Sequence, residues 1–210
     1  ETPLDEAGVR AMAKQIKDEG EIEALAAFLE QLIRLPNGHL CYHPSEDAPE
    51  IGPLPMTSNQ VITFGSFNNL AKITPEVVDS WVGILQAVPR SRLLLKNASL
   101  GSPGVRERYM SLFAASIEPE RIIFKAWLPS RQAHFALYNE VDIALDTFPF
   151  NGVATTCESL WMGVPVVTWR GDRHSARLGA SLLTRVSLED LVASDINGYV
   201  TTAVTLAGDP

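Results

Sequence analysis

Short apolar runs recur along the chain and are separated by longer stretches with helical spacing. Five such runs are predicted to be strands: residues 61–67, 92–96, 121–125, 142–146 and 164–169. Several are apolar on both faces, as in RLLLK and RIIFK, which is typical of strands buried between two layers of helices. The pattern therefore predicts a parallel sheet that is covered on both sides.

Helical stretches alternate with these runs. The first has Thr74 as its N-cap and Pro75 at its first position, which are two independent start signals. The others are expected over residues 105–117 and 131–138, from near Val153, and over residues 174–183, 188–193 and 196–206. This alternation predicts an α/β fold with a doubly wound, parallel, Rossmann-like sheet. In such sheets the ligand lies beyond the carboxyl ends of the strands.

The amino-terminal part of the chain has a different pattern. Residues 7–17 and 22–35 have helical spacing and are interpreted as packing helices. Residues 44–59 hold four prolines among acidic and small residues, which indicates a linker or wrapping loop. We therefore divide the chain into residues 1–59 and a sheet-forming lobe over residues 60–210.

Composition and charge exclude several classes of function. The apolar share of 46% is ample for a core, and the formal charge of −8 with a pI near 5.0 argues against a nucleic-acid surface. The apolar runs are too short to span a membrane, so no membrane contact is expected. Two cysteines and four histidines show no disulfide or metal-ligand spacing, which predicts no metal cofactor and fits a cytoplasmic setting.

Familiar catalytic motifs are also absent from the sequence. The loop after the first strand reads GSFNNLAK and contains no GxGxxG, which argues against a dinucleotide dehydrogenase. The absence of GxxxxGK[ST] and of GxSxG argues against a P-loop NTPase and an α/β-hydrolase.

Residues 142–169 combine the features of an anion-binding site. The helix begins near Val153, directly after Gly152, and a helix start exposes unpaired N–H groups and the positive end of the helix dipole. Thr155 and Glu158 are three residues apart and so share one helix face. The opposite face is expected to be a buried stripe of Val153, Cys157, Leu160 and Trp161. Amides, a hydroxyl and a carboxylate on one face predict a nucleotide clamp.

Individual side chains at this edge allow two interpretations each. Lys72 could neutralise a diphosphate leaving group or could be a solvated loop lysine. His134 could pack on a nucleotide base or could be a partly buried helix residue. Glu158 could accept ribose hydroxyl hydrogen bonds, or could only stabilise the helix start. Asp142 and Asp146 are interpreted as acceptors for nearby backbone groups.

Four motifs then follow one another in the chain: FGSFNNLAKITPEVVDSW, RLLLKN, ALYNEVDIALDTFPFNG and TTCESLWMGVPVVTWRGDRHSARLGASLL. Together they resemble the carboxyl-terminal catalytic lobe of the O-linked N-acetylglucosamine transferase family, in particular bacterial members with upstream tetratricopeptide repeats. The resemblance implies the donor-nucleotide-binding lobe of a GT-B glycosyltransferase that is inverting, metal-independent and uses a UDP-sugar. It also implies that the proline-rich segment joins two lobes.

The resemblance implies roles for individual residues as well. Lys72 falls on the lysine that contacts the diphosphate, and catalysis is assigned to it. His134 falls on the histidine beside the uracil, and Glu158 on the acidic residue that holds the ribose. The nucleotide site implied in this way also includes Asn69, Leu128, Gly152, Ala154, Thr155 and Thr156.

Two departures from the family pattern qualify these expectations. Val153 and Ala154 stand where small or hydroxyl residues are common, so one hydroxyl contact to phosphate is missing and donor affinity is expected to be weaker. A hydrogen bond to a charged group contributes about 1.5–3 kcal/mol. Residues 1–60 also hold no counterpart of the amino-terminal lobe or of the repeats.

We therefore expect one lobe of a larger protein O-glycosyltransferase, inactive alone. It would bind UDP or UDP-N-acetylglucosamine and reach a protein acceptor, at serine or threonine, through the missing lobe and repeats. Two alternatives stay open. The chain could be a nucleotide-binding or interaction module without turnover, or the same fold could use another nucleotide sugar such as GDP-fucose.

Overall fold

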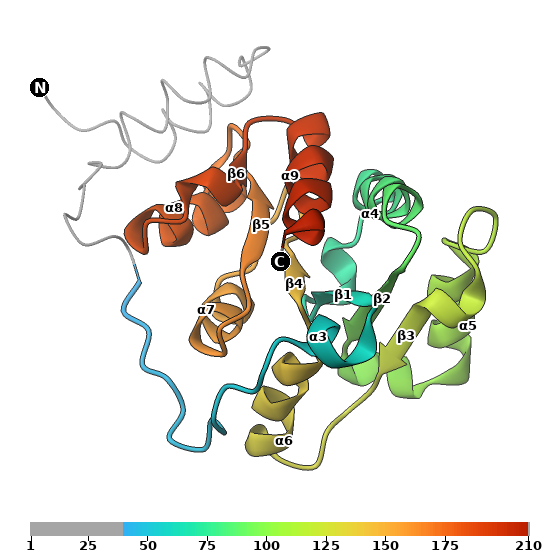
Figure 1. The fold of residues 1–210 in the computed structure, drawn as a ribbon, viewed down its shortest axis with the longest axis horizontal. Helices are drawn as coiled ribbons and strands as arrows, with labels where there is room; N and C mark the ends of the chain where they lie inside the picture. Colours follow the sequence, from blue (N-terminus) through green and yellow to red (C-terminus); the bar gives the residue numbers. More distant parts are fainter. Residues whose placement is uncertain (1–39, 210) are drawn as a thin grey trace, which may run out of the picture. The chain divides into compact units, whose positions relative to one another are not determined.

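The computed structural model describes residues 40–209, which contain a six-stranded, wholly parallel sheet (Figure 1). The strands are β1 (Ile62–Ser66), β2 (Ser91–Lys96), β3 (Ile122–Lys125), β4 (Ile143–Leu145), β5 (Val166–Trp169) and β6 (Val192–Ala193). They lie in the order β3-β2-β1-β4-β5-β6. The chain therefore reverses its direction of winding between β1 and β4, where ligand crevices form in such sheets. The predicted doubly wound, Rossmann-like fold is confirmed.

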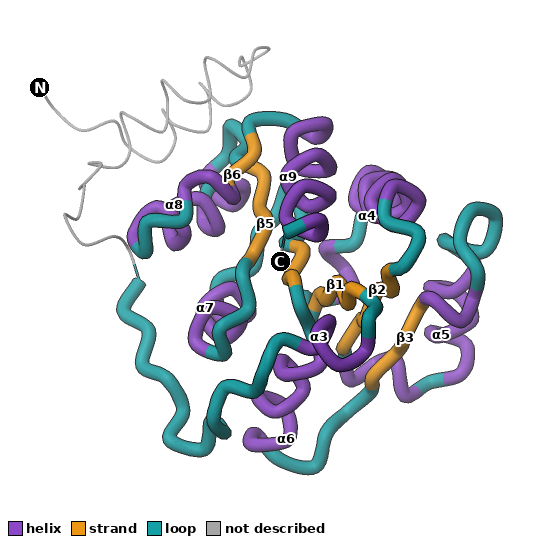
Figure 2. The backbone as a smooth tube through the Cα atoms, viewed as in Figure 1, coloured by secondary structure: helices purple, strands orange, loops and turns teal. Residues whose placement is uncertain are grey.

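Helices cover both faces of the sheet (Figure 2). One core lies under α4 (Pro75–Ala87), α5 (Pro103–Ser111) and α9 (Ile196–Gly208), and the other under α6 (Arg131–Ala136), α7 (Ala154–Trp161) and α8 (Leu178–Arg185). Leu93 and Leu95 of β2 belong to the first core and Leu94 to the second. The strands are thus buried on both faces, as their apolar pattern predicts.

Short helices connect the main elements. They are α3 (Pro55–Asn59) and the 3-10 helices η1 (Leu70–Lys72), η2 (Ala98–Gly101), η3 (Pro119–Arg121), η4 (Leu137–Glu140), η5 (His174–Ala176) and η6 (Glu189–Leu191). The start signals of α4 are confirmed, because the Thr74 hydroxyl accepts the N–H of Val77 at 3.4 Å and Pro75 is the first helical residue. Local capping chemistry alone determines this boundary.

The sequence-based prediction of a helix over residues 188–193 was wrong. Only Glu189–Leu191 is helical there, and Val192 and Ala193 form the sixth strand, paired with Thr168 and Trp169 of β5. The open edge of β5 offers unpaired backbone groups, and pairing with them outweighs the local helical spacing.

Other helix boundaries also differ from the prediction. Helix α5 ends at Ser111 instead of residue 117, although the apolar residues Phe113 and Ile117 beyond it are buried in turns. Helix α8 begins at Leu178, after a 3-10 turn that starts at His174. Helix α3 lies inside the loop expected over residues 44–59. Helix ends are the least certain part of a prediction from sequence, because the last turn often frays.

The segment 40–54 contains no helix or strand and is held against the lobe by side chains near β4. Asn139 accepts the N–H of Gly52 at 3.0 Å and donates to the Glu50 carbonyl at 3.2 Å. Asp142 accepts the N–H groups of Met56 and Thr63, each at 2.7 Å, which confirms its interpretation as a backbone acceptor. The predicted division at residues 59 and 60 stays a prediction, and the helices expected over residues 7–17 and 22–35 lie outside the described residues.

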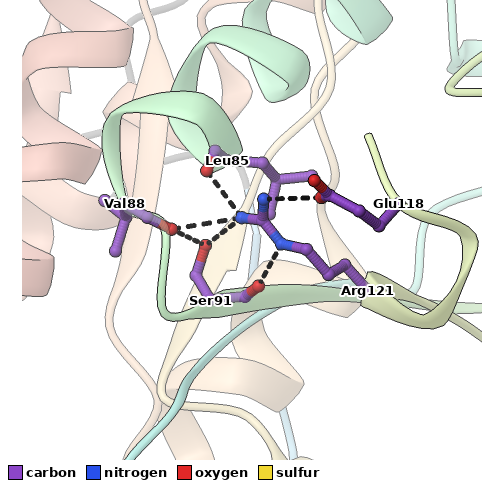
Figure 3. Close-up of polar contacts among 5 residues, drawn as sticks. All are labelled: Leu85, Val88, Ser91, Glu118 and Arg121. Atoms are coloured by element: carbon purple, nitrogen blue, oxygen red, sulfur yellow. Dashed lines mark hydrogen bonds and ion pairs between the residues drawn. The ribbon is translucent and has the colours of Figure 1, made fainter. Parts of the chain in front are cut away.

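Arg121 joins three elements at the amino edge of the sheet (Figure 3). Its guanidinium donates to the carbonyls of Leu85 and Val88 at the end of α4, at 2.6 and 3.2 Å. It also donates to the main-chain oxygen and the hydroxyl of Ser91, and pairs with Glu118 at 3.2 Å. One side chain therefore satisfies carbonyls that the helix end leaves without partners.

Candidate functional site

A small crevice, lined mostly by buried residues, lies at the switch point, at the carboxyl ends of β1 and β4. It is lined by Ser66 and Asn68 after β1, by Asp146 after β4, and by Thr155 and Ser159 of α7. This is the edge at which the strand order predicts a ligand. Three sequence segments that are distant along the chain therefore meet at one place.

Asp146 closes the loop between β4 and α7. Its side chain is 2% exposed, and one carboxylate oxygen accepts the N–H groups of Thr147 at 2.8 Å and Gly152 at 2.6 Å. The other oxygen accepts the Thr168 hydroxyl at 2.7 Å. Burial raises the pKa of Asp146 to about 6, while these hydrogen bonds and the charge of Lys72 act to lower it. The interpretation of Asp146 as a backbone acceptor is confirmed.

Glycine at two positions leaves room for the Asp146 carboxylate. A methyl group at Gly152 would lie 2.8 Å from the side-chain oxygen of Asn68 and 3.2 Å from Asp146, and would overlap the Thr155 hydroxyl. A methyl group at Gly179 would lie 2.6 Å from the second Asp146 oxygen. The backbone thus approaches the carboxylate from both sides, which only glycine permits here.

Lys72 points toward the same loop from the end of η1. Its ammonium donates to the main-chain oxygen of Asn151 at 2.8 Å and lies 4.3 Å from the ring centroid of Phe150. The Asn151 side chain is fully buried and donates to the Thr147 carbonyl at 2.9 Å, so the accepting carbonyl is fixed. Burial lowers the pKa of Lys72, and the charge of Asp146 raises it.

Glu158 is the centre of a second polar group. One of its oxygens lies 3.0 Å from Nε2 of His134 and accepts the Tyr138 hydroxyl at 3.1 Å. The Phe67 ring packs against Tyr138 with centroids 4.4 Å apart. Burial lowers the pKa of Lys96, at the end of β2, and the Glu158 charge raises it. The structure therefore brings together His134 and Glu158, which the sequence places on different helices.

The hydroxyl residues of α7 have separate partners. Thr155 donates to the side-chain oxygen of Asn68 at 3.1 Å, across the crevice. Thr156 is 2% exposed and donates to the Gly152 carbonyl at 3.2 Å. Ala154 is exposed at the first position of the helix. Of the two hydroxyls, only that of Thr155 reaches across the crevice.

The two remaining predicted site residues lie at its edges. Asn69 is exposed, and its side-chain oxygen accepts the N–H of Ala71 at 3.0 Å, which caps η1 ahead of Lys72. Leu128 follows β3 and packs partly buried against the second core. Both side chains stay predicted site residues.

The buried stripe expected on α7 was partly wrong. Cys157 is buried, but Trp161 is 49% exposed, and Thr156 and Ser159 take the inward positions. The helix has only eight residues and ends at Trp161, so its last side chain extends beyond the sheet. Sequence reasoning also missed Asn68, although its position in a small polar loop after β1 was the available signal.

Neither a metal centre nor a membrane span is visible in the part of the chain that the structure describes. Between residues 40 and 209, no group of three or more His, Cys, Asp or Glu side chains could hold a metal ion. No helix in that range is both long and apolar enough to cross a bilayer.

The fold and the crevice define the Rossmann-like lobe of a GT-B glycosyltransferase. The same fold occurs in α,α-trehalose 6-phosphate synthase from Burkholderia multivorans, at 12% identity and a TM-score of 0.51 over 74% of this chain and 37% of that one. The chain belongs to glycosyl transferase family 41, whose family model matches residues 54–210.

Two more similar proteins carry names that describe an activity. A probable UDP-N-acetylglucosamine–peptide N-acetylglucosaminyltransferase SPINDLY from Solanum lycopersicum is 48% identical over 182 residues, which is 86% of this chain and 20% of that protein. A mutant of the Thermobaculum terrenum O-GlcNAc transferase is 38% identical, with a TM-score of 0.80, over 86% of this chain and 34% of that one. The chain thus spans about a fifth of the length of the curated relatives it matches.

Proposed function

We propose that this lobe binds the UDP-sugar donor of an inverting, metal-independent protein O-glycosyltransferase, most simply UDP-N-acetylglucosamine. The observation that carries the proposal is the arrangement of α7 between two polar groups. Lys72 meets the loop before its first residue, and His134 meets Glu158, which stands in its second turn. A cation at one end and a carboxylate at the other match the two halves of a nucleoside diphosphate.

Lys72 and the exposed start of α7 supply the charge stabilisation in this proposal. A serine or threonine hydroxyl of the acceptor attacks the anomeric carbon, and the bond from that carbon to the diphosphate oxygen breaks. UDP leaves with the bonding electron pair. Lys72 and the first amides of α7 would then neutralise the growing negative charge. Family membership and the names of the relatives support this chemistry.

Transfer requires a larger protein in this proposal, because the lobe offers donor contacts and leaves the acceptor to other parts. Its setting is proposed to be cytoplasmic, which is supported by the free thiols of Cys41 and Cys157. Asn69, Leu128 and Thr156 complete the proposed nucleotide site at its edges.

Calorimetry with this chain tests the proposal directly. UDP is expected to bind saturably below millimolar concentration and to displace GDP, whereas GDP should displace UDP poorly. No heat at millimolar UDP would contradict the proposal. Preferential binding of GDP would keep the fold and the site but replace the donor by a guanosine nucleotide sugar.

A further inference from the structure

Two polar atoms near Glu158 are buried without a hydrogen-bond partner. They are the hydroxyl oxygen of Tyr42 and Nδ1 of His134, and no other buried side-chain nitrogen or oxygen between residues 40 and 209 is in this state. Buried polar groups in proteins nearly always have hydrogen-bond partners, because a buried donor or acceptor without one costs free energy. Two such atoms beside one carboxylate therefore point to a local function.

Tyr42 comes from the segment 40–54, outside the sheet-forming lobe as the sequence defines it. Its hydroxyl lies within electrostatic range of Glu158 and Cys157 on α7 and of Arg131 at the start of α6. Burial and the Glu158 charge both raise the pKa of this hydroxyl. Tyr42 also lies within electrostatic range of Tyr138, whose hydroxyl donates to Glu158. Tyr42 thus lies near side chains of α6, η4 and α7.

Lys72 and Tyr42 lie near different carboxylates. Lys72 is coupled to Asp146, whereas Tyr42 and Lys96 are coupled to Glu158. Tyr42 therefore lies near Glu158, the carboxylate assigned to the ribose, whereas the diphosphate is assigned to Lys72. Ribose hydroxyls both donate and accept, so they can satisfy a phenol and an imidazole nitrogen in either tautomer.

We propose that Tyr42 is a nucleoside-binding residue whose hydroxyl hydrogen-bonds the ribose held by Glu158. This inference rests on the proposed function of the lobe. The side chain stands in a segment without helix or strand, which packs on the second core at Ala48 and is hydrogen-bonded to Asn139 at Glu50 and Gly52. Tyr42 can therefore turn toward a ligand without moving an element of the sheet.

The substitution Tyr42→Phe is expected to raise the Tm of the chain and to weaken its binding of UDP and uridine. Removing a buried hydroxyl without a partner should raise the Tm, by about 2–4 °C for a domain of this size. It should weaken the binding of UDP and of uridine by the same factor, about 3- to 10-fold, because one neutral hydrogen bond is lost. Pyrophosphate affinity should not change.

Tyr109→Phe is the matched control for stability. Its hydroxyl donates to the Leu70 carbonyl at 2.9 Å, so its removal should lower the Tm, where Tyr42→Phe raises it. Equal UDP and uridine affinity in Tyr42→Phe and the unchanged chain would overturn the Tyr42 proposal alone. An equal loss of pyrophosphate affinity would also overturn it. Absence of UDP binding by the unchanged chain would overturn both this proposal and the proposed function.

Discussion

The ammonium of Lys72 donates to the main-chain oxygen of Asn151 across a gap of 2.8 Å, between residues that come from opposite sides of the switch point. This contact directs the cation at the loop that leads into α7. The position of the charge is thus set by a backbone atom, and the loop geometry and the lysine act together.

Replacing this lysine tests whether it binds the diphosphate or the nucleoside part of UDP. Lys72→Ala is expected to weaken UDP binding by about 10- to 100-fold, since a charge-assisted hydrogen bond contributes about 1.5–3 kcal/mol. Uridine, which lacks the diphosphate, should bind as before. Arg90→Ala removes the same charge at the exposed amino edge and is the control in calorimetry. Equal UDP affinity in both variants would contradict the assignment of Lys72.

A methyl group at Gly152 should damage the loop. The added carbon would crowd Asn68, Asp146 and Thr155, so Gly152→Ala is expected to lower the free energy of unfolding by about 1–3 kcal/mol. UDP affinity should fall as well, because the start of α7 must shift. Gly104→Ala, where no atom lies within 4 Å of the new carbon, should be neutral or slightly stabilising in urea unfolding. A harmless Gly152→Ala would show that the loop adapts freely.

The buried carboxylate of Asp146 should make stability depend on pH. Its pKa is about 6 in the folded chain and 3.8 in the reference state, so folding favours the protonated form. The contribution is fully present below about pH 4 and is lost as pH rises through about 6, with a total on the order of 3 kcal/mol. Asp146→Asn should remove this part of the slope in urea unfolding between pH 4 and pH 7.

Two other titratable groups lie near Asp146. The charge of Lys72 acts on its carboxylate, and the Tyr199 hydroxyl donates to its main-chain oxygen at 2.8 Å. Because Lys72 stays charged through this pH range, its titration does not produce the same slope. Asp79→Asn, at an exposed carboxylate on α4, serves as the control and should keep the slope. An unchanged slope in Asp146→Asn would assign the pH dependence to other groups.

Replacing Arg121 should lower the stability of the chain without changing its affinity for UDP. Arg121→Ala leaves the carbonyl of Leu85 without this donor and that of Val88 with the Ser91 hydroxyl alone, and is expected to cost about 2–4 kcal/mol of unfolding free energy. Arg121→Lys should recover only part of this, because one ammonium cannot reproduce the planar fork. UDP affinity, measured well below the Tm, should be unchanged in both. A matching loss of affinity would mean that the two edges of the sheet are coupled.

The sequence predicts those parts of the fold that depend on local chemistry. Thr74 and Pro75 determine the start of α4, and five strands are visible as apolar runs. Strand β6 is not visible, because two residues carry no periodicity and their conformation comes from pairing with Thr168 and Trp169. The exposed end of α7 at Trp161 likewise depends on helix length, which the apolar spacing does not reveal.

The rule that ligands bind beyond the carboxyl ends of the strands predicts those parts of the candidate site that directly follow a strand. Lys72 and Gly152 were identified because parallel strands end at one edge of the sheet. The pairing of His134 with Glu158 required the packing of α6 beside α7, and that packing has no sequence signal. Tyr42 lies far from Glu158 along the chain, in a proline-rich stretch whose course only the three-dimensional structure reveals.

The close approach of Gly152 and Gly179 to the two oxygens of Asp146 ties three positions into one unit of evolutionary change. A chain that keeps the aspartate cannot enlarge either glycine without a clash, and a chain that loses it still has Asn68 and Thr155 beside Gly152 and Thr168 beside Gly179. Among homologous sequences, side chains larger than glycine at these two positions should therefore appear together with changes at Asp146 and at the neighbouring Asn68, Thr155 or Thr168. An ancestor in which all three differ would define when this loop acquired its present form.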